Sequence, residues 1–295
     1  FFVKILIPLT FIKKLFIFFK KNISKKYNFK LQVICVGNIY IGGTGKTPTS
    51  LLIANELTNK GKKVAIIRKF YKNHSDEHLL IKKYFNNLIL NTNRVKGIIN
   101  AQKHGYEFAV LDDGFQDYRI KSNLNIVCFN ANQQFGNGLI FPAGPLREDL
   151  KALKNAQVVI INGKKNKDFE QQILKENKDI DIYYSKYHAV NLEEFKNKKL
   201  IALAGIGNPE NFFSILKENN LNVIKKLIYP DHYKFKNSEI SEIITKSKEE
   251  KCQIIMTEKD YYKIVDYNIP NIKFLKVSLK IEKQEELVKK ILKLN

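Results

Sequence analysis

VGNIYIGGTGKTP, from Val36 to Pro48, is the stretch that decides the fold. It stands between an apolar run at residues 31–36 and a helical pattern at residues 49–57. A strand, a Gly-rich turn and a helix in this order make a phosphate-binding P-loop. The glycines let backbone N–H groups approach phosphate oxygens, and the helix N-terminus adds partial positive charge. The usual pattern has glycine five residues before Gly45, where this chain has Tyr40.

The residues expected to hold the phosphates are Tyr40, Ile41, Gly42, Gly43, Thr44, Gly45, Lys46 and Thr47. Lys46 is expected to reach the β- and γ-phosphates of a nucleotide, and the hydroxyl of Thr47 to bind Mg²⁺. The alternative is a Gly-rich turn with an incidental lysine. The strand–turn–helix context favours the phosphate site.

The composition is that of a globular protein with an excess of lysine. A net charge of +22 over 295 residues suggests an anionic partner: nucleic acid, acidic lipid or a phosphorylated substrate. Only four of the 51 basic residues are arginine, which indicates an AT-rich coding bias, so the charge counts for little. The lysines are dispersed rather than clustered with aromatic residues, and we expect no nucleic-acid partner. Three widely spaced cysteines predict buried thiols rather than a disulfide or zinc site.

The N-terminal stretch, residues 1–21, is rich in both phenylalanine and lysine. Its charge-free runs are too short for a spanning helix, and no small-residue cleavage site follows it. From residue 10 one helical face carries Phe11, Ile12, Leu15, Phe16, Phe18 and Phe19, and the other carries Thr10, Lys13, Lys14, Lys20 and Lys21. This pattern predicts an amphipathic helix lying in an anionic membrane interface. The alternative is a helix packed on the body of the protein.

Strand-like and helical patterns alternate beyond residue 30, which predicts an α/β fold with a parallel sheet. The expected strands of the first part are residues 31–36, 63–68, 87–90, 107–111, 124–129 and 157–161. The alternation restarts near residue 199 and ends in a helix. We therefore expect an N-terminal helix at 1–25, a P-loop domain at 26–195 and a second, smaller α/β domain at 196–295.

A second nucleotide signal is the strand-like run that ends in Asp112 and Asp113. A carboxylate at the end of a strand beside the P-loop can hold Mg²⁺ directly or through water. Its position about 65 residues after the P-loop strengthens a signal that is weak alone. The alternative is an exposed Asp-Asp-Gly turn.

Three further groups have both a functional and a structural interpretation. Arg147 and Glu148 end the Gly- and Pro-rich stretch FGNGLIFPAGPLRE; they could neutralise a γ-phosphoryl and join a metal shell, or form a surface pair. Asp76 could be a carboxylate base or belong to a helix cap. His232 follows Asp231 and could be an oriented acid/base, or an incidental histidine in a turn.

Together these segments closely resemble one family, the tetraacyldisaccharide 4′-kinases. Besides the N-terminal helix and the P-loop, the matching pieces are the Asp76–Glu77 pair, Arg94, LDDGFQ, FGNGLIFPAGPLRE, AGIGNPENFF, PDHYKF and TEKDYYK. They span nearly the whole chain, and DDGFQ with FPAGPLRE at this separation is highly specific. The resemblance implies a P-loop NTPase-like fold and a membrane-associated, Mg²⁺-dependent kinase on the cytoplasmic face of the bacterial inner membrane. Its reaction would transfer the ATP γ-phosphoryl to the 4′-hydroxyl of tetraacyldisaccharide 1-phosphate, forming lipid IVA in lipid A biosynthesis.

The resemblance also implies roles for individual residues. Lys46 and Thr47 would handle phosphates and Mg²⁺, and Asp113 and Glu148 would complete the metal shell. Arg147 would steady the γ-phosphate. Asp76 would be the base that receives the 4′-hydroxyl proton, with His232 of the second lobe as its partner once the lobes close. The expected partners are the lipid substrate and an anionic membrane, and the expected oligomeric state is a monomer.

The chain departs from the family pattern at two places. Arg68, Lys69, Phe70 and Tyr71 stand where the family has a segment like Ser-Arg-Gly-Tyr-Gly, and Asp117 stands where the family has histidine. The main rival interpretation is a membrane-associated positioning ATPase of the deviant-Walker type. Such proteins need a lysine directly before the Gly-Gly pair, and this chain has Ile41 there.

Overall fold

The computed structural model describes the chain except for residues 1, 73–74, 232, 265–271 and 295. The chain divides into two compact units. Unit 1 consists of residues 1–70, 85–186 and 280–295, and unit 2 of residues 71–84 and 187–279.

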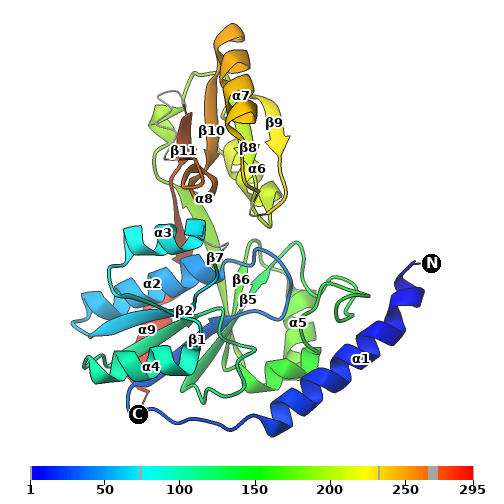
Figure 1. The fold of residues 1–295 in the computed structure, drawn as a ribbon, viewed down its shortest axis with the longest axis vertical. Helices are drawn as coiled ribbons and strands as arrows, with labels where there is room; N and C mark the ends of the chain where they lie inside the picture. Colours follow the sequence, from blue (N-terminus) through cyan, green and yellow to red (C-terminus); the bar gives the residue numbers. More distant parts are fainter. Residues whose placement is uncertain (1, 73–74, 232, 265–271, 295) are drawn as a thin grey trace. The chain divides into compact units, whose positions relative to one another are not determined.

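An eight-stranded sheet forms the centre of unit 1 (Figure 1). Its strands are β1 (Gln32–Gly37), β2 (Val64–Lys69), β3 (Leu88–Asn91), β4 (Phe108–Asp112), β5 (Leu124–Asn130), β6 (Val158–Asn162), β7 (Asp181–Ala189) and β12 (Val277–Ile281). Their spatial order is β12-β7-β6-β5-β1-β4-β2-β3, and each neighbouring pair from β7 to β3 is parallel. β1 is central, so the loop that follows it lies where a parallel sheet binds its ligand, at the carboxyl ends of the strands.

Helices cover both faces of this sheet, as a parallel sheet requires. They are α2 (Lys46–Asn59), α4 (Arg94–Lys103), α5 (Lys167–Glu176), α9 (Gln284–Leu292) and the 3-10 helix η1 (Leu150–Asn155). Buried side chains of β1, β2 and β4 pack with α4, and those of β5 and β6 pack with α5. A cluster of three phenylalanines, Phe129, Phe135 and Phe169, joins β5 and α5 with edge-on ring contacts.

Unit 2 is a smaller α/β body with its own sheet. The sheet has four parallel strands in the order β11-β10-β8-β9, namely β8 (Leu200–Ala204), β9 (Val223–Ile228), β10 (Gln253–Thr257) and β11 (Ile272–Leu275). Its helices are α3 (Ser75–Tyr84), α6 (Pro209–Glu218), α7 (Asn237–Glu249), α8 (Glu258–Tyr261) and the short η2 (Leu192–Glu194). Phenylalanines of α6 pack on one face of the sheet and Ile240 of α7 on the other, so this sheet is also covered twice.

The units differ from the domains expected at 26–195 and 196–295. Residues 71–84 belong to unit 2, because α3 is tied to α8 by hydrogen bonds from Tyr84 to Glu258 of 2.7 and 2.9 Å. Residues 280–295 return to unit 1, because Leu287 and Ile291 of α9 are fully buried and α9 contacts α2.

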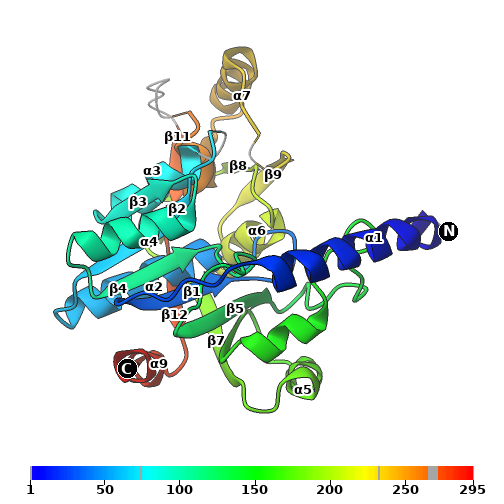
Figure 2. The same cartoon turned by 60° about the horizontal axis from the view of Figure 1, so that its bottom comes forward.

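The N-terminal segment forms one helix, α1 (Phe2–Ile23), within the range 1–25 expected for it. Both views show it along one side of unit 1 with its N-terminal end projecting (Figure 1 and Figure 2). Its polar face contacts the body: the Thr10 hydroxyl donates to the Ile140 carbonyl at 3.0 Å, and Lys14 pairs with Asp149 at 3.0 Å. The apolar side chains point away; Phe11 is 68% and Phe16 67% exposed.

This orientation is the reverse of a helix that packs on a body by its apolar face. α1 thus contacts unit 1 through its polar face, and its place in a membrane interface stays a prediction. None of the described helices has the length and hydropathy that would let it cross a bilayer.

Candidate active site

The P-loop connects β1 to α2 at the carboxyl edge of the unit 1 sheet. Gly42 and Gly45 have φ of 129° and 88°, left-handed conformations that a side chain would oppose. α2 begins at Lys46, and no side chain caps its N-terminus. The first N–H groups of α2 are therefore left to a ligand, and the helix dipole favours an anion.

The loop that carries Arg147 runs beside the P-loop. The Ile41 N–H donates to the Pro145 carbonyl, and the Arg147 N–H donates to the Ile39 carbonyl, both at 2.8 Å. Tyr40 and Leu146 form an antiparallel bridge. Backbone pairing thus brings two stretches about 105 residues apart into one structure, and it places Arg147 beside the P-loop.

Asp112, not Asp113, lies against the predicted metal-binding hydroxyl. The Asp112 carboxylate is fully buried at the end of β4 and accepts a hydrogen bond from the Thr47 hydroxyl at 3.1 Å. The Ser50 hydroxyl donates to it at 3.2 Å, and Arg68 forms an ion pair with it. The sequence showed both aspartates, but a pattern of apolar strand plus acids does not reveal which carboxylate turns toward the P-loop.

Asp113 instead organises the cations of the site. Its backbone has φ of 58°, a conformation that aspartate tolerates better than most residues. The Asp113 carboxylate accepts from Arg147 at 2.8 Å and lies 3.8 Å from the Lys46 ammonium. Burial alone would raise the pKa of Asp113, but Lys46, Arg147 and Arg94 together outweigh burial and hold that pKa below its usual value.

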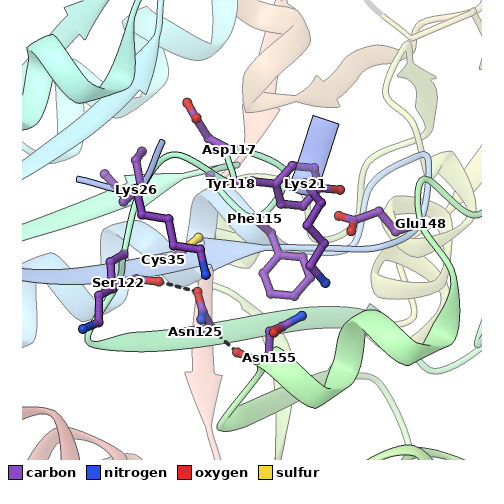
Figure 3. A pocket seen from close by; sticks show the side chains of 14 residues that line it. Lys21, Lys26, Cys35, Phe115, Asp117, Tyr118, Ser122, Asn125, Glu148 and Asn155 are labelled. Carbon is purple, nitrogen blue, oxygen red and sulfur yellow. Dashed lines mark hydrogen bonds between the residues drawn. The ribbon is translucent and has the colours of Figure 1, made fainter. Parts of the chain in front are cut away.

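Glu148 lies in a separate cavity of about 170 Å³ near the C-terminal end of α1 (Figure 3). Its neighbours there include Tyr118, Phe115 and Lys21. Burial raises the pKa of Glu148, and hydrogen bonds to Tyr118 and Gln116 only partly oppose that rise. Within the described residues, no three His, Cys, Asp or Glu side chains gather as metal ligands. The structure therefore does not bring Glu148 together with Asp112 and Asp113.

The remaining donors nevertheless fit Mg²⁺. Thr47 and Asp112 offer a hydroxyl and a carboxylate at a helix N-terminus, and Mg²⁺ in nucleotide sites takes one or two protein oxygens, with phosphates and water completing its shell. A cationic group, the guanidinium of Arg68, already lies beside both oxygens. The site is thus built for positive charge.

Asp76 and the region of His232 belong to unit 2. Asp76 is 5% exposed in the first turn of α3. The ammonium of Lys259 lies 2.9 Å from Glu77, 3.1 Å from Asp231 and 3.9 Å from Asp76. His232 lies outside the described residues, so its predicted contact with Asp76 stays a prediction. Its neighbour Asp231 belongs to the same unit as Asp76, and both carboxylates contact Lys259.

TEKDYYK, a stretch noted in the sequence only through the family resemblance, holds unit 2 together around Asp76. The Thr257 hydroxyl caps α8, and Asp260 accepts from the Gly205 N–H at 2.8 Å and from Lys263 at 2.6 Å. Glu258 and Lys259 contact α3 as described above. Residues 257–263 therefore contact the backbone at Gly205, the side chain of Asp231 and helix α3.

A sequence model of the family described as tetraacyldisaccharide-1-P 4′-kinase (LpxK) matches residues 3–295. The chain belongs to this family. It is 40% identical to the tetraacyldisaccharide 4′-kinase of Pelagibacter ubique over 298 residues, which cover 100% of this chain and 94% of that protein. It is 32% identical to the protein of the same name from Francisella novicida, over 88% of this chain and 89% of that one.

A solved structure has the same fold. It is the crystal structure of LpxK from Aquifex aeolicus, described as an "apo" form in complex with ATP. It matches with a TM-score of 0.75 and 24% identity, covering 100% of this chain and 99% of that chain. Both the family resemblance and the α/β fold with a P-loop-type parallel sheet are therefore confirmed.

Proposed function

We propose that this chain transfers the γ-phosphoryl group of ATP to the 4′-hydroxyl of a tetraacylated glucosamine disaccharide 1-phosphate, giving lipid IVA. Membership of the tetraacyldisaccharide-1-P 4′-kinase family supports the reaction and the acceptor. The observation that supports ATP as the phosphoryl donor is the uncapped N-terminus of α2, with Lys46 at its start and Thr47 beside Asp112. The positioning ATPase has no comparable support, since Ile41 stands where its lysine is needed.

The proposed ATP site consists of the P-loop residues 40–47. Their N–H groups would bind phosphate oxygens, and Lys46 would neutralise the charge of the β- and γ-phosphates. Thr47 and Asp112 would hold Mg²⁺, which when bound draws charge from the phosphate oxygens. Glu148 was expected among the metal ligands, and its place in a separate cavity argues for Asp112 in its stead.

In this proposal Asp113 positions the cations of the site, and Arg147 binds the γ-phosphoryl group. Asp113 separates two like charges and holds both at the cradle, since it contacts the Arg147 guanidinium and the Lys46 ammonium. The Gln116 amide oxygen accepts a second hydrogen bond from Arg147 at 3.3 Å. A guanidinium held from two sides needs little reorganisation to meet the γ-phosphoryl oxygens.

Asp76 is the proposed base for the 4′-hydroxyl proton, with His232 as its partner. A carboxylate is a weak base at neutral pH, so a neighbouring imidazole would orient it or pass the proton on. The burial of Asp76 and the fixed position of α3 against α8 support a preorganised role. We also propose that the monomer is the active form.

The proposed location is the cytoplasmic face of the inner membrane, where ATP meets the acylated acceptor. α1 supports peripheral attachment, because its outward face is apolar while its polar face is held by unit 1. Lys20 and Lys21 in its last turn add attraction to anionic lipid headgroups.

The direct test of this function is a transfer assay with γ-labelled ATP, Mg²⁺ and tetraacyldisaccharide 1-phosphate dispersed in detergent. We expect label in the lipid, at the 4′ position. ATP hydrolysis without labelled lipid would contradict the proposed acceptor and would move the positioning ATPase to first place.

Replacing Phe11, Phe16 and Phe19 together by serine should release the protein from anionic vesicles. Each phenylalanine gives up buried apolar area in the interface, about 2 kcal/mol per side chain, so affinity should fall by several powers of ten. Sedimentation with phosphatidylglycerol-containing vesicles measures the affinity of each variant for the membrane.

The matched control exchanges Ile224 and Ile228, exposed apolar residues of unit 2, for serine and should leave vesicle binding unchanged. Vesicle binding that survived the triple α1 substitution would contradict the role of α1. Circular dichroism should show the body of the protein still folded in both variants.

A further inference from the structure

Arg68 lies beside the proposed metal site because of the sheet register. β2 and β4 are neighbouring parallel strands, and Arg68 is the register partner of Asp112. Residues side by side in a parallel pair point to the same face, so the two side chains meet. The Arg68 side chain is 8% exposed, and its guanidinium forms an ion pair with the Asp112 carboxylate.

The same guanidinium also reaches Thr47. Its Nη1 atom lies 3.5 Å from the Thr47 hydroxyl oxygen while it contacts Asp112. Arg68 thus touches both oxygens that would hold Mg²⁺. A positive group of this chain lies where the divalent cation is expected.

Asp112 needs such a partner when no metal is present. A fully buried carboxylate is destabilising unless a cation or several hydrogen bonds compensate it. The hydroxyls of Thr47 and Ser50 supply hydrogen bonds but no charge. The nearest other cations, Lys46 and Arg147, are held by Asp113. Arg68 is therefore the group that neutralises Asp112.

Mg²⁺ and the guanidinium cannot share this position without strong repulsion. Arginine stays charged at any pH the protein meets, so it cannot relieve the conflict by losing a proton. Like charges a few ångströms apart in a partly buried site repel strongly because little water screens them. One of the two cations must give way when the other binds.

We propose that Arg68 is a built-in counter-cation of the metal site that competes with Mg²⁺ for Asp112. It neutralises Asp112 in the metal-free protein and must release Asp112 before the metal–nucleotide is held. The inference rests on the proposed assignment of Thr47 and Asp112 to the metal.

The test is Mn²⁺ binding to the whole chain in the presence of ADP. The electron paramagnetic resonance signal of free Mn²⁺ measures how much of the metal is bound. Arg68→Gln keeps a hydrogen bond to Asp112 but removes the charge. It should lower the apparent Kd for Mn²⁺ by about tenfold or more. Arg68→Lys keeps the charge and should stay within about twofold of the native protein. Without metal, in EDTA, Arg68→Gln should melt at a lower temperature than the native protein, because Asp112 is left without a cation.

Arg119→Gln is the matched control, since that guanidinium pairs with Asp117 at the surface and is 40% exposed. It should leave Mn²⁺ affinity unchanged. Unchanged or weaker Mn²⁺ binding by Arg68→Gln would overturn the proposal, as would equal effects of the glutamine and lysine variants. Mn²⁺ binding is read without any lipid, so a failed transfer assay would count against the proposed acceptor and not against Arg68.

Discussion

Lys46→Met should lower kcat for phosphoryl transfer about 1,000-fold, the effect of removing one preorganised donor from a developing charge. Lys46 begins α2, its side chain is 13% exposed, and its ammonium lies 3.8 Å from Asp113. Burial lowers the pKa of Lys46, while Asp113 and Asp112 favour its charged form. Because water has little access to this ammonium, it would interact with phosphate charge with little screening. Methionine keeps the shape of the side chain but removes the charge.

The measurement is single-turnover transfer of label from ATP to the lipid. Lys62→Met is the control, because Lys62 forms an exposed pair with Glu107 and should retain native turnover. If Lys46→Met kept more than about a tenth of the native rate, the P-loop would not be the site of transfer.

Asp76→Asn should lower kcat by a factor of about 100 to 10,000, the range found for general bases, with an almost unchanged KM for ATP. Asparagine keeps the shape of the side chain but cannot accept the 4′-hydroxyl proton. The loss therefore belongs to the chemical step and not to nucleotide binding. Steady-state rates at varied ATP and varied lipid separate the two effects.

Glu77→Gln is the matched control for Asp76. Both carboxylates are neighbours of Lys259, and the Glu77 contact is the shorter one, so an effect due only to the loss of an ion pair should be larger in Glu77→Gln. We expect that variant to stay within about fivefold of native kcat. A normal kcat with a raised KM for ATP in Asp76→Asn would make Asp76 a nucleotide contact or a structural residue.

The strands of unit 1 were largely predictable, for a physical reason. Strands buried on both faces read as unbroken apolar runs, and β1 to β6 each begin within one residue of the expected position. β7 was missed because it is only half-buried and contains Lys186 and His188, so it gives no such run. Near the C-terminus, β11 and β12 are separated by one residue and yet belong to different sheets, which no local pattern indicates.

The sequence indicated which residues would form the site, but not which of their side chains would contact one another. The P-loop and Arg147 follow from local patterns, and the structure places them side by side. Asp112, the last residue of β4, meets Thr47, while Asp113, just beyond the strand, does not; a sequence with aspartate at both positions leaves no mark of this difference. The pairing of Arg68 with Asp112 depends on strand order, since β2 lies next to β4 and not next to β1.

Synthesis of the chain must complete unit 2 before unit 1. β12 and α9 come after all the described helices and strands of unit 2 in the sequence. They supply the edge strand beside β7 and the buried residues Leu287, Val288 and Ile291 of unit 1. Until they emerge from the ribosome, the nascent sheet keeps an open edge at β7, which is a site for wrong pairing with other chains. Nucleotide that binds the early-made P-loop cannot replace this late segment, so a chain cut after residue 279 should be lost to aggregation or proteolysis.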